Sequence, residues 1–455
     1  MLGYSLGSTT RVVENIVSFY LVFYLTLVIG IEPVIAGAIS SGALLWGSFI
    51  SPFIGHYADR PGRKRKLVLL TTVPLAVFQT LLFTSFDLNP TASIIYYLII
   101  GCLCYSFLRF FSIPYDALGA ELSQSYDMRS TIRALCTFFI YLSVVIGGTL
   151  TLYLQGLFYE SGNSLTASWV YAVLPSSIVI IISGLSAWIS TKHIDKPLPE
   201  IKHEVSVKSN SILNSFKEIL KIKPFVALLV WCALFYIAFG LLVPNSIYFR
   251  VFYIGMTESE AAFLFTVGVL ASFVSIPIAT ILIKKFGKRS IMIISMLVYI
   301  IPAIAVLLRG APGPVDAWIL AIAYGLANST ALITSFSMLY DIGELTEIVT
   351  GEKKTTPLVG AFTFIVGISK ALGYVLFGLS LQVGGFNSAQ EAQSEHMLQV
   401  MLYISTIVPA TLIFLSIFAL LFYRINKNNF NALLHAIELK KNGKSYSPDG
   451  FKELL

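Results

Sequence analysis

The stretch "ADRPGRKRKL", residues 58–67, places an Asp, a Pro-Gly pair and five basic residues between two long apolar runs. Glycine permits a tight reversal of the chain, and charged side chains are costly inside the hydrocarbon layer of a membrane. The stretch therefore predicts a short connection in water between two helices that cross a bilayer.

The composition predicts a membrane environment for the whole chain. Of the 455 residues, 56% are hydrophobic and 12% are charged, and the mean hydropathy is +0.79. A soluble domain carries about 25% charged residues. A membrane helix needs about 20 apolar residues, and the chain contains twelve such runs. The predicted spans are 11–30, 33–57, 67–86, 92–115, 131–156, 168–191, 224–249, 257–283, 290–308, 315–340, 357–384 and 397–423.

The basic residues predict the orientation of these spans. One set of connections, together with the tail, holds 26 of the 31 Lys and Arg residues, whereas the opposite set holds only Arg250 and Arg309. The positive-inside rule then places both termini in the cytoplasm. We expect a multi-pass integral protein of a bacterial inner (plasma) membrane.

An internal repeat predicts two equivalent halves. Pro52 and Gly62 recur as Pro277 and Gly287 at an offset of 225 residues, and the same offset relates Asp116 to Asp341. Parallel repeats of six helices each are typical of the major facilitator superfamily. The expected fold is therefore an all-α membrane protein of twelve transmembrane helices in two pseudo-symmetric six-helix bundles. The expected divisions are a first bundle 1–191, a cytoplasmic linker 192–223, a second bundle 224–424, and a cytoplasmic tail 425–455 with a short amphipathic helix.

Two motifs carry a closer resemblance. "IPYDALGAELSQSYDMRS" (113–130) and "SMLYDIGELTEIVTGEKK" (337–354) resemble the glycoside–pentoside–hexuronide branch of that superfamily, typified by melibiose permease and also containing lysolipid transporters. The resemblance spans nearly the whole chain. It implies secondary active transport by alternating access, often coupled to a cation.

The chain departs from this branch at its cation site. The sodium-coupled sugar carriers place two Asp residues in the second helix, where this chain has Gly47 and Ser51. The acidic position of the first helix falls at Arg11. Sodium, a hard cation, binds oxygen ligands, so we expect proton-coupled or uncoupled transport instead of sodium coupling.

This chain also differs from the sugar carriers of the branch at the positions that bind the sugar. The Asp expected before Ile-Pro is Ser112, and the Arg expected in the fifth helix is Cys136. The Lys of the eleventh helix is kept, as Lys370. The charged pair expected to hold a galactoside is therefore absent, and a different solute is expected.

Five charged residues fall inside predicted spans and form the candidate substrate and coupling site. They are Arg11, Glu14, Arg109, Asp116 and Lys370. Arg11 and Glu14 are three residues apart and share a helix face, so they can pair. The alternative is a set of static ion pairs, with Arg11 and Asp116 extending to the cytoplasmic surface.

Our hypothesis is that Glu14, Arg109 and Lys370 line a central cavity and favour an anionic or zwitterionic solute. Burial favours a neutral Glu14 and basic neighbours favour its carboxylate, which makes it the candidate proton site. Trp46 and Tyr374 are the aromatic candidates for stacking on a ligand, because the resemblance places their helices beside the cavity.

A cytoplasmic gate is expected where the tenth helix ends. Asp341, Glu344 and Glu347 lie on one helix face, and the resemblance implies basic partners for them. The remaining gate candidates are Asp59, Arg63, Arg129, Arg133, Lys288 and Arg289. The alternative is a solvated acidic cap, since exposed ion pairs contribute about 0–1 kcal/mol.

The sequence contains no metal-spaced His/Cys cluster, nucleophile motif or phosphate loop, so we expect neither an enzyme nor a cofactor. The prediction is a secondary transporter of a small polar, charged or sugar-like solute, acting as a monomer in the bilayer, with protons as a candidate partner and no nucleic acid. Two alternatives stay open. One is a lysolipid or amphiphile transporter on the same fold, and the other is a transporter-like sensor that binds without transport.

Overall fold

The structure is a computed structural model that describes residues 1–58, 63–122, 126–192, 219–350, 355–388, 390, 392–441 and 445. Within these residues all regular structure is helical, which confirms the predicted fold class. Twelve helical stretches are long and apolar enough to cross a membrane, as predicted.

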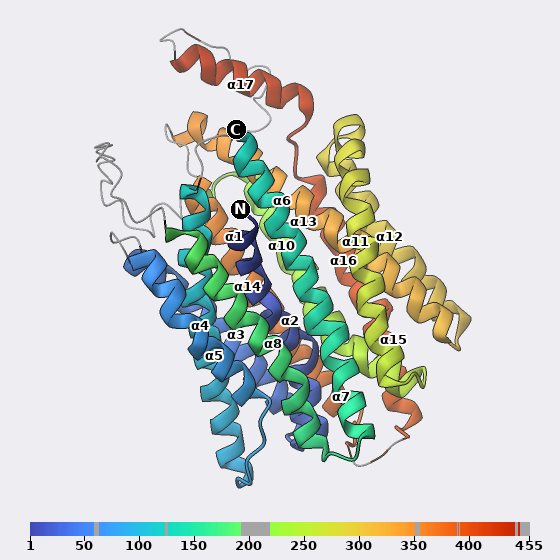
Figure 1. The fold of residues 1–455 in the computed structure, drawn as a ribbon. Helices are drawn as coiled ribbons and strands as arrows, with labels where there is room; N and C mark the ends of the chain where they lie inside the picture. The colour runs from blue at the N-terminus through green and yellow to red at the C-terminus, as the bar shows by residue number, and fades with distance from the viewer. Residues whose placement is uncertain are drawn as a thin grey trace. The chain divides into compact units, whose positions relative to one another are not determined.

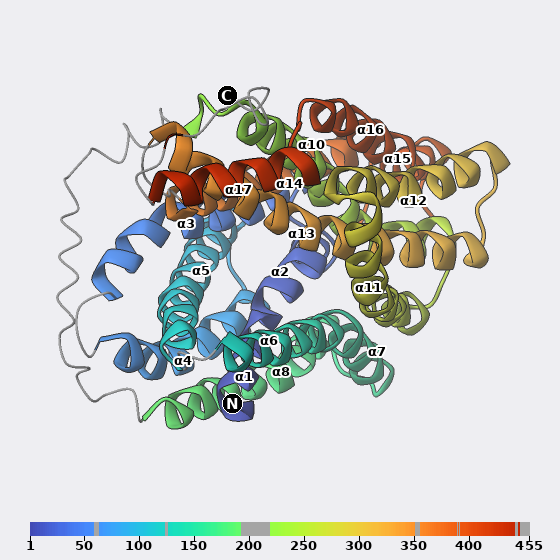
Figure 2. The same cartoon turned by 90° about the horizontal axis from the view of Figure 1, so that it is seen from above.

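The helices are shown in Figures 1 and 2. Their bounds are α1 (Leu2–Leu6), η1 (Gly7–Arg11), α2 (Val12–Phe23), η2 (Tyr24–Val28), α3 (Pro33–Ala58), α4 (Arg63–Leu82), α5 (Pro90–Glu121), α6 (Tyr126–Val145), η3 (Ile146–Leu150), α7 (Thr151–Glu160), α8 (Leu165–Ser190), α10 (Lys223–Tyr248), η5 (Phe249–Tyr253), α11 (Glu258–Phe286), α12 (Lys288–Arg309), α13 (Pro314–Thr350), α14 (Thr355–Val383), α15 (Glu395–Ser405), α16 (Ile407–Leu421) and α17 (Lys427–Lys441).

The first span begins at Leu2, so the predicted start at residue 11 was wrong. Hydroxyl-bearing residues made residues 2–10 look too polar for a span. In the structure these side chains are buried, and two of them bond within their own helical stretch: Thr9 Oγ1 donates to the Leu6 carbonyl, and Thr10 Oγ1 donates to the Gly7 carbonyl at 2.8 Å. Ser8 Oγ instead lies 3.0 Å from Tyr115 Oη on α5. A hydroxyl that bonds within its own helix leaves no unsatisfied group in the membrane.

Contacts divide the chain into two compact units. Unit 1 comprises Met1–His203, Leu241–Val269 and Tyr374–Leu402, and unit 2 comprises Glu204–Gly240, Leu270–Gly373 and Tyr403–Leu455. The boundaries between the units pass through α10, α11, α14 and α15. The units are defined by contacts within each, and the expected halves 1–191 and 224–424 stay a prediction.

In unit 1, α5 packs on α3 and α4, and α4 packs on α8, so that these helices lie side by side (Figure 1). Trp169 is fully buried, and the rings of Tyr20, Tyr24 and Phe83 lie within 6 Å of it. Asn89 caps α5 by accepting a hydrogen bond from the Ala92 amide at 2.8 Å. The cap fixes the beginning of the helix that carries Arg109, and the aromatic rings join the first span to α8.

In unit 2, α12 packs on α13 and α16, and α17 packs on α13. The amphipathic tail helix expected from the sequence is therefore confirmed as α17. It buries Leu433, Ala436 and Ile437, while Leu434 is 41% exposed. The expected linker 192–223 lies mostly outside the described residues.

Candidate functional site

Four charged side chains of unit 1 form one alternating chain, which we call the ionic network. Arg109 Nη2 lies 3.0 Å from Glu14 Oε1. Arg11 Nη1 lies 3.8 Å from the other oxygen of Glu14, and Arg11 Nη2 lies 3.2 Å from Asp116 Oδ2. The predicted Arg11–Glu14 pair is confirmed, and the structure brings together four of the five charged residues singled out in the spans.

The ionic network is held by the packing of the first span on α5. Tyr4 Oη donates to the Tyr115 carbonyl and Tyr115 Oη donates to the Tyr4 carbonyl, each at 2.8 Å. The two rings are stacked with their centroids 4.5 Å apart. This reciprocal pair joins the first span to α5 near Arg11 and Asp116. The register between the two helices is therefore fixed where the charges meet.

Two tyrosines also adjoin Glu14. Tyr105, one turn before Arg109 on α5, and Tyr374, on α14, both lie close enough to interact with Glu14, and Tyr374 also interacts with Ser18. Tyr105 is 1% exposed and Tyr374 is 2% exposed, which separates this side of Glu14 from lipid and water. Tyr374 was predicted for the site from its helix, whereas Tyr105 was missed, because a single tyrosine in an aromatic-rich span carries no signal of its own.

Gly47 and Ser51 of α3 stand at the two positions where the sodium-coupled sugar carriers have Asp residues. A Cβ on Gly47 would lie 3.1 Å from both the Cβ and the Cδ1 of Tyr105, so any side chain at this position would press on the Tyr105 ring. Ser51 Oγ donates to the Gly47 carbonyl at 2.7 Å. The hydroxyl is thus engaged within its own helix, and neither position presents a carboxylate.

Lys370 belongs to unit 2 and lies beside aromatic rings there. Its Nζ is 5.0 Å from the ring centroid of Phe239 and 5.5 Å from that of Tyr236. The close approach of α10 and α14 makes these contacts possible: a Cβ on Gly373 would come within 2.6 Å of the Gly240 Cα. Cation–π contacts of this kind stabilise an ammonium group away from water.

Trp46 lies on α3 of unit 1 and is 44% exposed. Its Nε1 donates to Ser106 Oγ at 2.9 Å, and its ring is 6.2 Å from Phe49. The predicted aromatic residues therefore differ: Tyr374 adjoins the ionic network, and Trp46 contacts neighbouring side chains of α3 and α5.

Residues 3–427 match the family described as MFS/sugar transport protein. The chain belongs to this family. The predicted resemblance is thereby confirmed, and the protein is a multi-pass membrane protein of a transporter family, not an enzyme.

Relatives within the family differ in what their names say they carry. The chain is 26% identical over 428 residues to an isoprimeverose transporter of Lactiplantibacillus pentosus, covering 91% of this chain and 85% of the relative. It is 21% identical over 469 residues to the sodium-dependent lysophosphatidylcholine symporter 1 of Xenopus tropicalis, covering 95% and 88%.

Among solved structures, the fold is similar to a bacterial homologue of the human lysosomal transporter Spinster, in an inward-facing and unoccupied conformation. The TM-score is 0.67 at 15% identity, covering 94% of this chain and 98% of that one. At this identity the likeness shows the fold alone.

The gate residues of this transporter are only partly described. In unit 2, Lys288 Nζ lies 2.6 Å from Asp341 Oδ2 and donates to the Ser337 carbonyl at 3.2 Å. Asp341 thus pairs with a basic residue of its own half of the sequence. Glu344 and Glu347 follow on α13 and are half-buried, as is Arg289.

The remaining gate candidates lie in the first half of the sequence. Arg63 lies over the Tyr57 ring, 4.4 Å from its centroid. Asp59 and the side chains of Arg129 and Arg133 lie outside the described residues. A gate that joins Asp341 to Arg129 or Arg133 therefore stays a prediction.

Arg250 is a buried charge of the transporter that was not predicted for any site. Arg250 in η5 of unit 1 is 8% exposed, donates to the Ala261 carbonyl at 2.9 Å and lies 4.7 Å from the Phe265 ring centroid. Phe265 in turn packs on Phe19 and faces Gly148. Arg250 is one of only two basic residues in the connections of the opposite side, and that rarity was the available signal.

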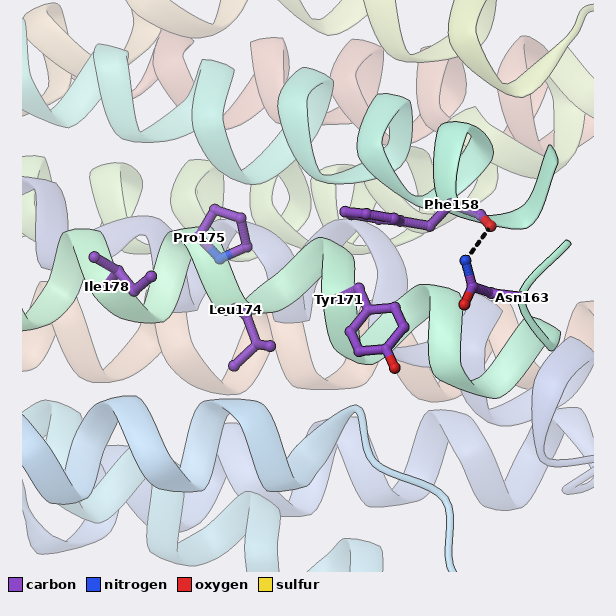
Figure 3. Close-up of a pocket in the computed structure, with 6 residues that line it drawn as sticks. All are labelled: Phe158, Asn163, Tyr171, Leu174, Pro175 and Ile178. Atoms are coloured by element: carbon purple, nitrogen blue, oxygen red, sulfur yellow. Dashed lines mark hydrogen bonds between the residues drawn. The ribbon is translucent and has the colours of Figure 1, made fainter. Parts of the chain in front are cut away.

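A surface groove of unit 1 lies apart from all predicted residues (Figure 3). It is lined by Phe158, Asn163, Tyr171, Leu174, Pro175 and Ile178 of α7, α8 and their connection. Asn163, the one amide in this lining, donates from Nδ2 to the Phe158 carbonyl at 2.9 Å. The lining is mostly apolar and contains no charged side chain, so the candidate site stays at the ionic network, where four charges meet.

Proposed function

We propose that this transporter is a proton-coupled symporter of a small polar solute that carries a negative charge. Glu14 takes up the coupling proton, and Arg109 and Lys370 are the cationic groups that favour the anion. The observation that carries the proposal is the pairing of Arg109 with Glu14 at 3.0 Å, in a part of the chain where the family's usual carboxylate positions are Gly47 and Ser51.

The chemistry of Glu14 supports this role. A carboxylate between two guanidinium groups is stabilised when ionised, and its partial burial stabilises the protonated form. The two effects oppose each other, so the balance between the two protonation states depends on whether the arginine partners stay in contact with Glu14. A group of this kind can gain and lose a proton as its surroundings change during transport.

We propose further that the protein acts as a monomer in a bacterial inner membrane with both termini in the cytoplasm. The expected halves 1–191 and 224–424 are the proposed moving parts. In this proposal Asp341, Glu344 and Glu347 close the cytoplasmic side against basic residues of the first half.

The proposal is tested in proteoliposomes that contain a pH-sensitive dye. Unlabelled sugars, sugar acids and lysolipids are added outside, and acidification of the lumen reports proton entry with the solute. We expect acidification with a charged solute, no requirement for sodium, and loss of acidification in Glu14→Gln. Glu32→Gln, which changes an exposed carboxylate between the first two spans, is the control. Uptake that needs a sodium gradient and ignores the pH gradient would overturn the proposal.

A further inference from the structure

The ionic network is balanced in charge. Arg11 and Arg109 stay protonated at every physiological pH, so two positive charges face the carboxylates of Glu14 and Asp116. With both acids ionised the sum is zero. A single proton on Glu14 leaves one positive charge in excess, inside a segment of low dielectric.

The excess charge falls on Arg109 and not on Arg11. Arg11 has two carboxylate partners, and Asp116 remains with it when Glu14 is neutral. In the described part of the chain, Glu14 is the acid that pairs with Arg109, and Arg109 Nε is buried with no hydrogen-bond partner. A guanidinium left without a partner in such a place is strongly destabilised unless another anion binds it.

The groups that face Glu14 show which residue of the ionic network can change its charge. Arg11 of η1, Arg109 and Tyr105 of α5, and Tyr374 of α14 face it, and Asp116 is reached through Arg11. Near neutral pH, arginine stays positively charged and tyrosine stays neutral. Of these groups, Glu14 is the acid that contacts Arg109, so we assign the proton to Glu14.

We propose that a single negative charge on the solute replaces the Glu14 carboxylate on Arg109, so that one proton and one monoanion enter together. A proton from water binds a Glu14 oxygen, the Arg109–Glu14 pair breaks, and an Arg109–solute pair forms. No covalent bond of the solute changes, and release reverses each step. This inference rests on the proposed function and deepens it: transport moves no net charge, and neutral solutes are excluded because they leave Arg109 unpaired.

The binding test uses pairs of compounds that differ in one charge. The pairs are glucuronate with glucose, N-acetylneuraminate with N-acetylmannosamine, and lysophosphatidylglycerol with monoacylglycerol. Thermal stabilisation of the purified full-length protein gives the affinity, and proton uptake is followed in weak buffer. We expect at least one monoanion to stabilise the protein, with about one proton taken up per anion bound. Its affinity falls about tenfold for each unit of pH above the point where Glu14 ionises.

Two variants keep the test decisive. Glu14→Gln leaves Arg109 free at every pH, so it should bind the same monoanion with no pH dependence and no proton uptake. The double variant Glu14→Gln with Arg109→Gln has no unpaired charge, should fold, and should lose the monoanion. Retention of the pH dependence by Glu14→Gln overturns the inference. So does retention of the anion by the double variant, or stabilisation of the wild type by neutral compounds alone.

Flux separates this inference from the proposed function. We expect uptake of the monoanion to follow the pH gradient and to be unchanged by a potassium diffusion potential of about 100 mV. A neutral solute taken up with protons through Glu14 would refute the exchange on Arg109 and leave proton coupling standing. Uptake that ignores the pH gradient would refute both.

Discussion

Gly47 removes one possible cation ligand from the second span, because it stands where the sodium-coupled carriers have an Asp. The Tyr105 ring lies against it, and Tyr105 in turn adjoins Glu14 and Arg109. Gly47 therefore has two effects: it provides no carboxylate, and it leaves space for the Tyr105 ring, which lies beside the ionic network. The sequence predicts the loss from the missing Asp, but it cannot predict which ring takes the vacated room, because that depends on the rotation of α5 against α3.

We predict that Gly47→Ala destabilises the protein and disturbs the ionic network. The added Cβ would lie 3.1 Å from both Cβ and Cδ1 of Tyr105, so the ring has to shift, at a cost of about 1–3 kcal/mol. Gly42→Ala on the same helix is the control, because its Cβ would meet only the terminal Cδ1 of Leu98, which can move. Thermal unfolding in detergent measures both, and equal losses of stability would contradict the prediction.

At the scale of elements, apolar length predicts the helices and says little about how they touch. The twelve spans follow from composition, and α17 follows from its amphipathic spacing. Helix crossings depend on where small residues let two backbones meet, and a single sequence with 32 glycines does not distinguish a contact glycine from a lipid-facing one. The α10–α14 crossing at Gly240 and Gly373 is such a contact, and it sets the rings beside Lys370.

We predict that Gly373→Ala separates α10 from α14. The new Cβ would lie 2.6 Å from the Gly240 Cα and from the Ile237 carbonyl oxygen, and backbone atoms cannot step aside. We expect a loss of about 2 kcal/mol or more, and weaker anion binding if Lys370 contributes to it.

Gly360→Ala on the same helix is the matched control for this crossing. No atom lies within 4 Å of its added Cβ, so the change should be neutral or stabilise α14 by up to about 1 kcal/mol. Unfolding transitions of the two variants are compared in the same detergent. A Gly373→Ala protein as stable as Gly360→Ala would show that the two helices do not need this close approach.

For the whole molecule, the distribution of charged residues along the sequence predicts more than the residues of any single site do. The pairing of Arg11, Glu14, Arg109 and Asp116 was only partly predictable: spacing gives the Arg11–Glu14 contact within one helix, but no spacing relates Glu14 to Arg109, which lies 95 residues later. The sorting of basic residues into one set of connections, by contrast, is read directly from the sequence. It predicts the orientation in the membrane without knowledge of any contact.

We predict that Ser161 faces the outside and Asn428 the cytoplasm. Both are exposed, Ser161 in the connection between α7 and α8 and Asn428 in α17. Ser161→Cys should react with a membrane-impermeant maleimide on intact spheroplasts, and Asn428→Cys only after permeabilisation, because 26 of the 31 basic residues are expected on the side of the tail. The unchanged protein is the control, since Cys104, Cys136 and Cys232 are buried and Cys102 is half-buried. The reverse labelling pattern would place the basic connections outside. It would also require the coupling proton to reach Glu14 by the opposite route.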